Sequence, residues 1–293
     1  MILVTGSSGH LGAAVVNELL NRVEAKNIAV MARDVSKLSE FKALGVEVRQ
    51  GDYNDLKSLI LAFKDVDKLY FVSGSDIEKR NQQHINVVDA AKEAGVKHII
   101  YTSFQRKTEA KDSVIGFIAN SHIDTEEYIK ASGIPYTILK HALYMEVIPL
   151  FIGQQVLESG VVYIPTEDGK VNFTSRQDLA EGAAKILTTN GHENKYYEFG
   201  SDVAVSMEDI AQILSKLSGK NISFVSPTTQ DFVKTLGEIG VPKPAIDITL
   251  GFSAGIAAGE FNAPTTTLKD LLGHELINIP TFLEATYLTT ETI

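Results

Sequence analysis

The stretch that decides the fold is "MILVTGSSGHLG", residues 1–12, in which Gly6, Gly9 and Gly12 stand three apart directly after a short apolar run. The apolar run is typical of a strand and residues 11–22 of a helix, so the glycines occupy a strand-to-helix turn. In such a turn the first glycine permits a tight bend, the second leaves room for a pyrophosphate, and the third lets the helix pack closely on the sheet. The pattern predicts a dinucleotide site at the start of this helix.

The helix start would hold the phosphates through its free N–H groups and its positive dipole end. Ser7 and Ser8 could add hydroxyl donors. A glycine pattern alone is a weak signal, and the alternative is a glycine-rich turn without a ligand. The strand before it and the helix after it favour the nucleotide site.

The rest of the first half repeats this strand–helix alternation up to about residue 140. Near-continuous Val/Ile runs separated by amphipathic stretches are typical of a parallel sheet covered on both faces. The sequence therefore predicts an α/β fold with a doubly wound parallel sheet. We expect strands at 2–5, 27–33, 46–52, 66–74, 96–103 and 134–140, and helices at 11–22, 35–45, 54–63, 81–95 and 119–133.

Beyond residue 140 the alternation breaks. We expect helices at 147–160 and 175–191 and at 206–219, where Ser206 and Asp209 have capping-box spacing. We predict that residues 1–140, with a returning segment at about 171–200, form an NAD(P)-binding domain. Residues 141–170 and 201–293 would form a smaller, partly interleaved α/β substrate domain.

Composition narrows the classes of protein. The 293 residues are 44% hydrophobic and 22% charged, with no cysteine and a net charge of −10. Disulfide-stapled and thiol-dependent classes are excluded, and the absence of cysteine fits a cytoplasmic location. No run reaches the roughly 20 apolar residues of a membrane span, no leader is visible, and no basic cluster suits nucleic acid. The oligomeric state is left open, with a homodimer as one possibility.

The end of the second predicted strand bears on the coenzyme. Arg33 stands where an acidic residue would bind the ribose 2′-hydroxyl of NAD, and its guanidinium suits the 2′-phosphate of NADP. Asp34 follows directly and leaves NAD as an alternative coenzyme, and Lys37 could add a second positive charge. The alternative for Arg33 is a solvated loop residue without a role in binding. Asp52, at the end of the third strand, either contacts adenine or caps the next helix.

Several motifs carry a family resemblance: "TGSSGHLG", "GDYND", "GVKHIIYTS", "SHIDTEEYIKASGIPYTILKHALY" and "GHENKYYEF". With them the chain resembles the NmrA-like branch of the atypical short-chain dehydrogenases, with a Rossmann domain. It is most similar to the members that reduce quinones and triphenylmethane dyes. The resemblance is specific over residues 1–220 and weak from about 225, where acceptor preference would be decided.

The resemblance implies NADP(H) binding, with NAD as the less favoured coenzyme. It implies that the glycine turn binds the pyrophosphate and that the ends of the second and third strands bind the adenosine. The ends of the later strands would lie near the nicotinamide. Lys140 stands where these relatives commonly carry Arg, and His10 and His141 also depart from the pattern. The candidate cofactor-binding residues are Gly6, Ser8, Gly9, His10, Leu11, Gly12, Arg33, Asp52, Tyr53, Ser73, Gly74, Thr102, Ser103 and Lys140.

The Tyr-x-x-x-Lys pair of typical short-chain dehydrogenases is missing from the helix predicted at 119–133. The spacing occurs at Tyr53–Lys57 and at Tyr136–Lys140, but the second lies on a strand, where four residues span roughly 13 Å. We attribute both to chance. His122 and Glu126 hold the i, i+4 positions instead, either as a proton-transferring pair or as a surface pair.

Without a strong acid the site favours an electron-poor acceptor, because the charge that develops on a quinone or cationic dye is delocalised or cancelled. Tyr144 joins His122 and Glu126 as a candidate catalytic residue. Tyr144, Met145, Phe117 and Phe151 are either walls of a flat, apolar acceptor site or ordinary core residues. No metal-ligand spacing is present. Residues 107–111 are either a solvated loop or a lid.

The leading hypothesis is an NADPH-dependent oxidoreductase that passes hydride to a quinone-like small molecule. The alternative is an NADP(H)-binding redox-sensing regulator of the NmrA type without catalysis. A sugar-nucleotide epimerase shares the glycine loop but needs the missing Tyr-Lys pair.

Overall fold

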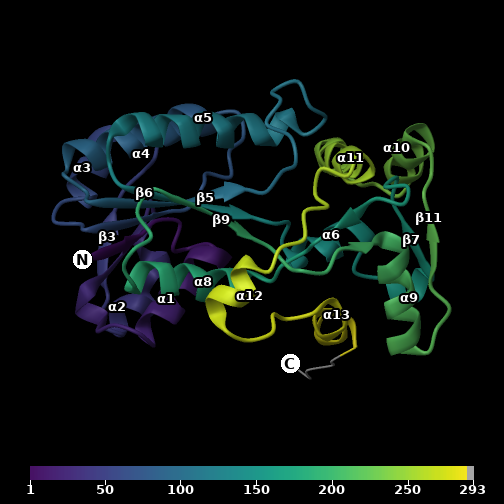
Figure 1. Cartoon of the computed structure of the whole chain (residues 1–293). Helices are drawn as coiled ribbons and strands as arrows, with labels where there is room; N and C mark the ends of the chain where they lie inside the picture. Colours follow the sequence, from purple (N-terminus) through teal and green to yellow (C-terminus); the bar gives the residue numbers. More distant parts are fainter. Residues whose placement is uncertain (289–293) are drawn as a thin grey trace.

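The computed structural model describes residues 1–288 and is built around one parallel sheet of seven strands (Figure 1). The strands lie in the order β3-β2-β1-β4-β5-β6-β9, and every neighbouring pair is parallel. This order confirms the predicted doubly wound Rossmann sheet. The strands are β1 (Ile2–Val4), β2 (Ile28–Ala32), β3 (Glu47–Gln50), β4 (Lys68–Phe71), β5 (His98–Phe104), β6 (Tyr136–His141) and β9 (Lys195–Phe199).

Helices cover both faces of the sheet, as Figure 1 shows. One face carries α1 (His10–Leu20), α2 (Ser39–Ala43), α8 (Arg176–Thr188) and α12 (Thr267–Leu272). The opposite face carries α3 (Leu56–Ala62), α4 (Arg80–Glu93) and α5 (Gly116–Ser132). Short 3-10 turns are η1 (Ala25–Asn27), η2 (Val35–Leu38) and η3 (Met145–Val147). Because both faces are covered, all residues of β2 and β5 are buried. β2 is accordingly an unbroken apolar run, whereas the buried polar side chains of β5, His98, Thr102 and Ser103, all form hydrogen bonds.

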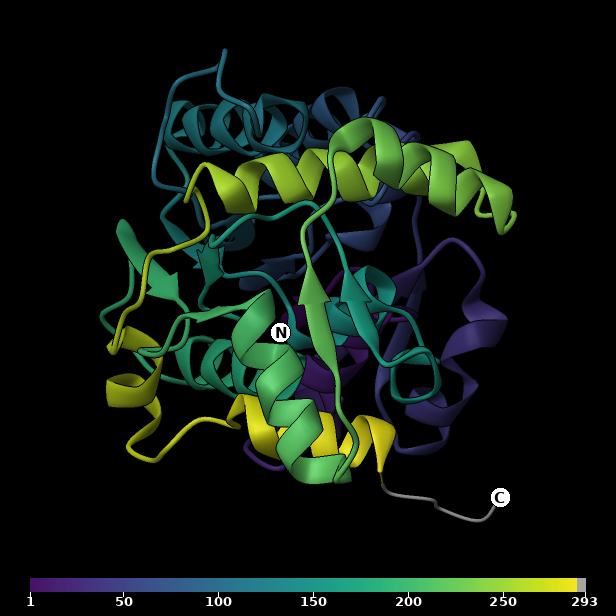
Figure 2. The same ribbon diagram turned by 90° about the vertical axis from the view of Figure 1, so that its right-hand side faces the viewer.

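The remaining elements gather at one end of the molecule, which Figure 2 views face on. Two small sheets lie here, one pairing β7 with β11 in parallel and one pairing β8 with β10 antiparallel. Their strands are β7 (Val161–Tyr163), β8 (Lys170–Val171), β10 (Val205–Ser206) and β11 (Ser223–Val225). The helices are α6 (Ile148–Ile152), α7 (Val156–Ser159), α9 (Met207–Ser218), α10 (Thr229–Glu238), α11 (Lys243–Ala257) and α13 (Ile279–Tyr287).

Local signals placed most helix ends correctly. Ser206 and Asp209 form the predicted capping box at α9. The helix predicted at 147–160 is wrong as one element, because Gly153 adopts φ 84° and separates α6 from α7. Three hydrophobic clusters fill the interior, two against the faces of the main sheet and one among residues 104–173 and 205–283. The predicted division into two domains stays a prediction.

No helix within residues 1–288 is both long and apolar enough to cross a membrane.

Candidate active site

A cavity of about 420 Å³ opens at the carboxyl ends of the central strands. This is the edge at which parallel α/β sheets bind ligands. Its walls come from the loops after β1, β2, β3 and β4 and from the start of α4. The lining residues are Gly6, Ser8, Gly9, Met31, Ala32, Arg33, Gly51, Asp52, Tyr53, Asn54, Val72, Ser73, Gly74, Ser75, Asp76, Lys79 and Gln83.

The glycine turn is shaped by backbone geometry. Gly6 adopts φ 60°, and the Gly9 N–H donates to the Gly6 carbonyl at 2.9 Å. A Cβ on Gly12 would lie 2.4 Å from the Gly6 oxygen, so the third glycine makes room for the turn itself and not only for the sheet. No side chain caps α1, which leaves the first-turn N–H groups, starting with His10 and Leu11, free for an anion. These features fit a pyrophosphate.

Three side chains around this turn differ in what they can contribute. Ser8 is exposed and lines the cavity, whereas the buried Ser7 hydroxyl donates to the Val4 carbonyl at 2.6 Å. The expectation of a second hydroxyl donor at Ser7 is therefore wrong. The side chain of Leu11 is buried, so only its backbone N–H is available to a ligand.

At the adenosine end the structure separates Arg33 from its acidic neighbour. Arg33 is exposed and lines the cavity. Asp34 caps η2 instead, accepting from the Ser36 N–H at 3.0 Å, and these hydrogen bonds to Ser36 lower the pKa of Asp34. Neither Asp34 nor Lys37 lines the cavity. Arg33 thus brings a positive charge to the adenosine end of the cavity, which suits a 2′-phosphate.

The loop after β3 resolves the alternative for Asp52. The N-cap of α3 is Asp55, so Asp52 is not the helix cap. Asp52 accepts from the Asn54 N–H at 2.9 Å and lines the cavity. The Tyr53 hydroxyl lies 2.6 Å from the Thr5 hydroxyl, and burial raises the pKa of Tyr53 above its usual range.

The predicted nicotinamide residues divide into two groups. Ser73 and Gly74 line the cavity. Thr102 and Ser103 are buried behind it: the Thr102 hydroxyl accepts from the Ser73 N–H at 2.8 Å, and the Ser103 hydroxyl donates to Glu126. These two hydroxyls hold protein groups and do not face the cavity.

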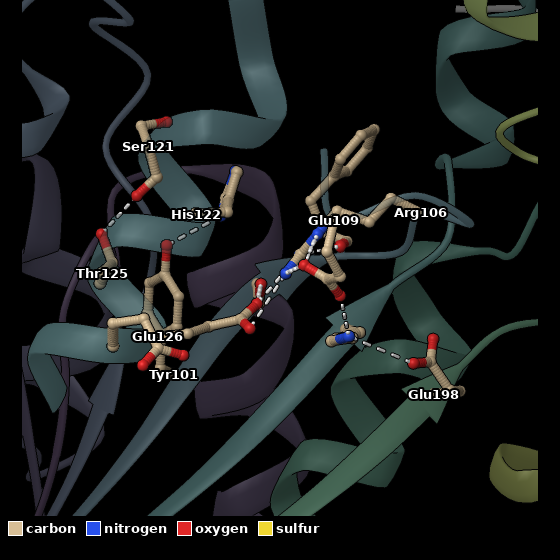
Figure 3. A network of polar contacts seen from close by, with 12 residues as sticks. Tyr101, Arg106, Glu109, Ser121, His122, Thr125, Glu126 and Glu198 are labelled. Atoms are coloured by element: carbon tan, nitrogen blue, oxygen red, sulfur yellow. Dashed lines mark hydrogen bonds and ion pairs between the residues drawn. The ribbon is translucent and has the colours of Figure 1, made fainter. Parts of the chain in front are cut away.

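The predicted proton-transferring pair is not formed. His122 and Glu126 are both buried on α5, but each binds another residue (Figure 3). His122 Nδ1 lies 2.8 Å from the Tyr101 hydroxyl, and Nε2 lies 3.4 Å from Arg80. Burial, helped by the nearby Arg80 charge, holds the pKa of His122 well below its ordinary value, so the ring is neutral. An i, i+4 spacing places two side chains on one helix face without joining them.

Glu126 belongs to a chain of ion pairs that Figure 3 follows across the sheet edge. Its carboxylate binds the fully buried Arg106 guanidinium through two hydrogen bonds of 3.0 Å. Arg106 also binds Glu109, which in turn accepts from Lys140 at 3.0 Å. Lys140 reaches Glu198 at 3.7 Å as well. The predicted cofactor ligand Lys140 is therefore paired with carboxylates and does not line the cavity.

The loop at 107–111 is anchored through this chain. Glu109 binds two cations, and the N–H groups of Lys107 and Thr108 donate to Glu260. A loop held at these points is more than a solvated turn. Whether it closes over a ligand stays a prediction.

Tyr144 follows β6 and keeps a free hydroxyl. The Arg176 guanidinium lies over its ring at 4.6 Å, and within residues 1–288 the Tyr144 hydroxyl has no hydrogen-bond partner. Burial raises the pKa of Tyr144 to about 12, so the phenol is protonated near neutrality and able to donate. Beside it, His141 is buried with neither ring nitrogen hydrogen-bonded.

Other predicted features have clear positions. Tyr136–Lys140 lies on strand β6, as expected, so it cannot form a helical pair. Met145 is a core residue, whereas Phe117 and Phe151 both contact Phe252 of α11, at 5.8 and 5.9 Å between ring centroids. Residues 1–288 hold no cluster of three or more His, Asp or Glu suited to a metal ion.

Sequence reasoning missed Arg80, His84, Tyr101 and Arg106. All four are buried, and all bind polar groups around the end of β5 or the loop after β4. A signal was present for two of them: Arg80 and His84 are i, i+4 neighbours on the buried face of α4, where polar side chains need partners.

Comparison with known proteins identifies the family. The model of the NmrA-like family matches residues 1–261, and the chain belongs to this family. The resemblance drawn from the sequence is thereby confirmed. Its relatives with this fold include reductases.

Among these relatives is quinone oxidoreductase 2 of Escherichia coli, to which the chain is 37% identical over 274 residues, 94% of each protein. The structure of that enzyme with NADPH matches with a TM-score of 0.91 and 35% identity, covering 97% of this chain and 99% of that one. The Citrobacter sp. triphenylmethane reductase with NADP(H) matches with a TM-score of 0.90 and 38% identity, covering 97% and 99%.

Proposed function

We propose that this protein is an NADPH-dependent oxidoreductase that reduces a quinone-like small molecule by two electrons. The observation that carries the proposal is the cavity at the sheet edge, with an uncapped helix start on one side and Arg33 at its mouth. The engagement of Asp34 by Ser36 supports NADPH over NADH. The relatives named above, a quinone oxidoreductase and a dye reductase, support the reaction class.

Different residues of the chain would bind different parts of the coenzyme and the acceptor. The glycine turn and the first N–H groups of α1 would bind the pyrophosphate, and Arg33 the 2′-phosphate. A bound coenzyme would supply hydride, and a quinone acceptor that gained this hydride and one proton would become the hydroquinone. Tyr144 does not line the cavity. Its neutral phenol, which has no hydrogen-bond partner within residues 1–288, would donate a hydrogen bond to the oxygen of an acceptor bound beside the cavity. Since His122 is already bonded on both nitrogens, we do not give it this role.

The family relationship leaves room for a non-catalytic redox sensor, but no feature of the site favours that alternative. The relatives named above are a quinone oxidoreductase and a triphenylmethane reductase, which favours a catalytic function. A cytoplasmic location and the absence of a nucleic-acid partner remain expectations from composition.

The test compares Arg33→Ala with the wild-type protein, using calorimetry and NAD(P)H oxidation with 1,4-benzoquinone or menadione. Loss of a charged hydrogen bond of about 1.5–3 kcal/mol should weaken NADPH binding roughly 10- to 150-fold and leave NADH binding unchanged. The matched control is Lys37→Ala, a nearby cation outside the cavity, which should bind both coenzymes as wild type does. Wild-type protein that binds NADPH but reduces no quinone or dye would refute the reductase assignment.

A further inference from the structure

The loop after β4 forms one wall of the cavity, and the two peptide groups on either side of Gly74 are each held by a side chain of α4. The Gly74 N–H donates to His84 Nε2 at 2.9 Å. The Gly74 carbonyl accepts from Arg80 Nε at 2.6 Å. A Cβ on Gly74 would lie 2.8 Å from the Gln83 side-chain oxygen, so a larger residue would displace the Gln83 side chain. The structure thus fixes both backbone polar atoms of a cavity-lining residue.

The two residues that hold this peptide are buried on α4 and braced by α5. His84 is 1% exposed, and its Nδ1 lies 2.7 Å from the Thr125 hydroxyl. The Thr125 hydroxyl in turn donates a hydrogen bond to the Ser121 carbonyl at 2.6 Å. Arg80 is 5% exposed, and its Nη1 reaches the Ser121 hydroxyl at 3.2 Å and His122 Nε2 at 3.4 Å. Figure 3 shows the α5 part of this arrangement.

The hydrogen-bond directions are mutually consistent. A backbone N–H only donates, so His84 Nε2 is the acceptor for the Gly74 N–H. The proton of the neutral His84 ring is then on Nδ1, which donates a hydrogen bond to the Thr125 hydroxyl. A guanidinium only donates, so His122 Nε2 accepts from Arg80 and its Nδ1 donates to the Tyr101 hydroxyl. Both rings are neutral with a fixed tautomer. Buried hydrogen bonds of this kind rigidify the groups that they join.

We propose that His84 and Arg80 are positioning residues for the coenzyme. By holding the N–H and the carbonyl of Gly74 they keep the cavity wall in its binding shape before the ligand arrives, and His122 supports Arg80 through a hydrogen bond. This inference rests on the proposed function in one respect, the identity of the ligand as NADPH. Preorganising a wall of the site raises affinity, because the ordering does not have to be accomplished during binding.

The experiment uses three variants of the full chain. His84→Leu removes the acceptor for the Gly74 N–H, and His84→Gln restores an acceptor and a donor. The control is His98→Leu, which also loses a buried histidine bond, the 2.8 Å contact with Thr137, but at the amino end of β5. The readouts are hydrogen exchange of the Gly74 amide without coenzyme, calorimetric Kd for NADPH, and KM and kcat.

In His84→Leu we expect the Gly74 amide to exchange at least tenfold faster and the Kd and KM for NADPH to rise about tenfold, with kcat within twofold. His84→Gln should recover most of both effects, and His98→Leu should show neither. Wild-type exchange and affinity in His84→Leu, or equal losses in His98→Leu, would overturn the inference. Wild-type protein that failed to bind NADPH would instead overturn the proposed function, and the exchange result alone would still decide whether His84 holds Gly74.

Discussion

Replacing His141 with phenylalanine tests how a buried, unpartnered imidazole makes stability depend on pH. The ring of His141 is 1% exposed and stacks on Phe199, with centroids 5.9 Å apart and planes 4° from parallel. Within residues 1–288 neither ring nitrogen has a hydrogen-bond partner, and burial lowers the pKa of His141 to about 3. Phenylalanine keeps an aromatic ring for the stack and removes the titration.

The sign follows from the two pKa values. In the unfolded chain a histidine titrates near 6.5, so between pH 6.5 and pH 3 the unfolded state holds a proton that the folded state lacks. Stability is therefore lost as the pH falls below 6.5. Integrated from pH 7 to pH 5, this one site removes about 2 kcal/mol from the free energy of unfolding.

The assay is urea unfolding of both proteins at the two pH values. His141→Phe should lose about 2 kcal/mol less than wild type on going from pH 7 to pH 5, whatever overpacking costs at either pH, because that cost cancels in the difference. The control is His274→Gln, an exposed histidine whose pKa is raised by its bonds to Glu275 and Glu181, and it should not reduce the loss. An equal loss in wild type and His141→Phe would refute the reasoning.

Four further predictions concern the glycine turn, a helix glycine, the ion pairs of Arg106 and the Tyr53 hydroxyl. Gly12→Ala, whose Cβ would lie 2.4 Å from a loop carbonyl oxygen, should weaken NADPH binding at least tenfold in calorimetry. Gly237→Ala, with no atom within 4 Å of the new Cβ, should instead stabilise α10 by about 0.5–1 kcal/mol in urea unfolding. Glu126→Ala removes the buried partner of a guanidinium and should cost about 3–5 kcal/mol in the same assay, whereas the exposed Glu109→Ala should cost less than about 1 kcal/mol. Tyr53→Phe should cost about 1–2 kcal/mol, because its hydroxyl joins the ends of β1 and β4, and wild-type stability would contradict this.

The sheet and the glycine turn could be predicted because their signals are local. A strand buried on both faces favours a continuous apolar run, as in β2, and a residue at φ 60° in a tight turn favours glycine, as at Gly6. The same logic should have ended the helix at Gly153. The apolar residues on both sides of Gly153 follow a helical spacing, and the prediction therefore continued the helix through the glycine.

The polar networks could not be predicted, because their partners are distant in the sequence and meet only in the folded chain. The spacing of His122 and Glu126 does not show that the His122 ring binds Tyr101 or that the Glu126 carboxylate binds Arg106. The predicted strand places Lys140 at the edge of the sheet. It does not show that Lys140 binds Glu109, which lies on another loop.

The chain leaves the main sheet and later rejoins it, and this has a practical consequence for experiments that truncate the protein. After His141 the backbone leaves the main sheet, and it comes back to supply α8 and the edge strand β9, with Leu268 of α12 closing over them. A fragment ending at residue 141 would leave β6 as an open edge and uncover the apolar face that α8 shields. Acceptor preference is thus better altered by exchanging surface loops within the intact polypeptide than by grafting one half onto another reductase.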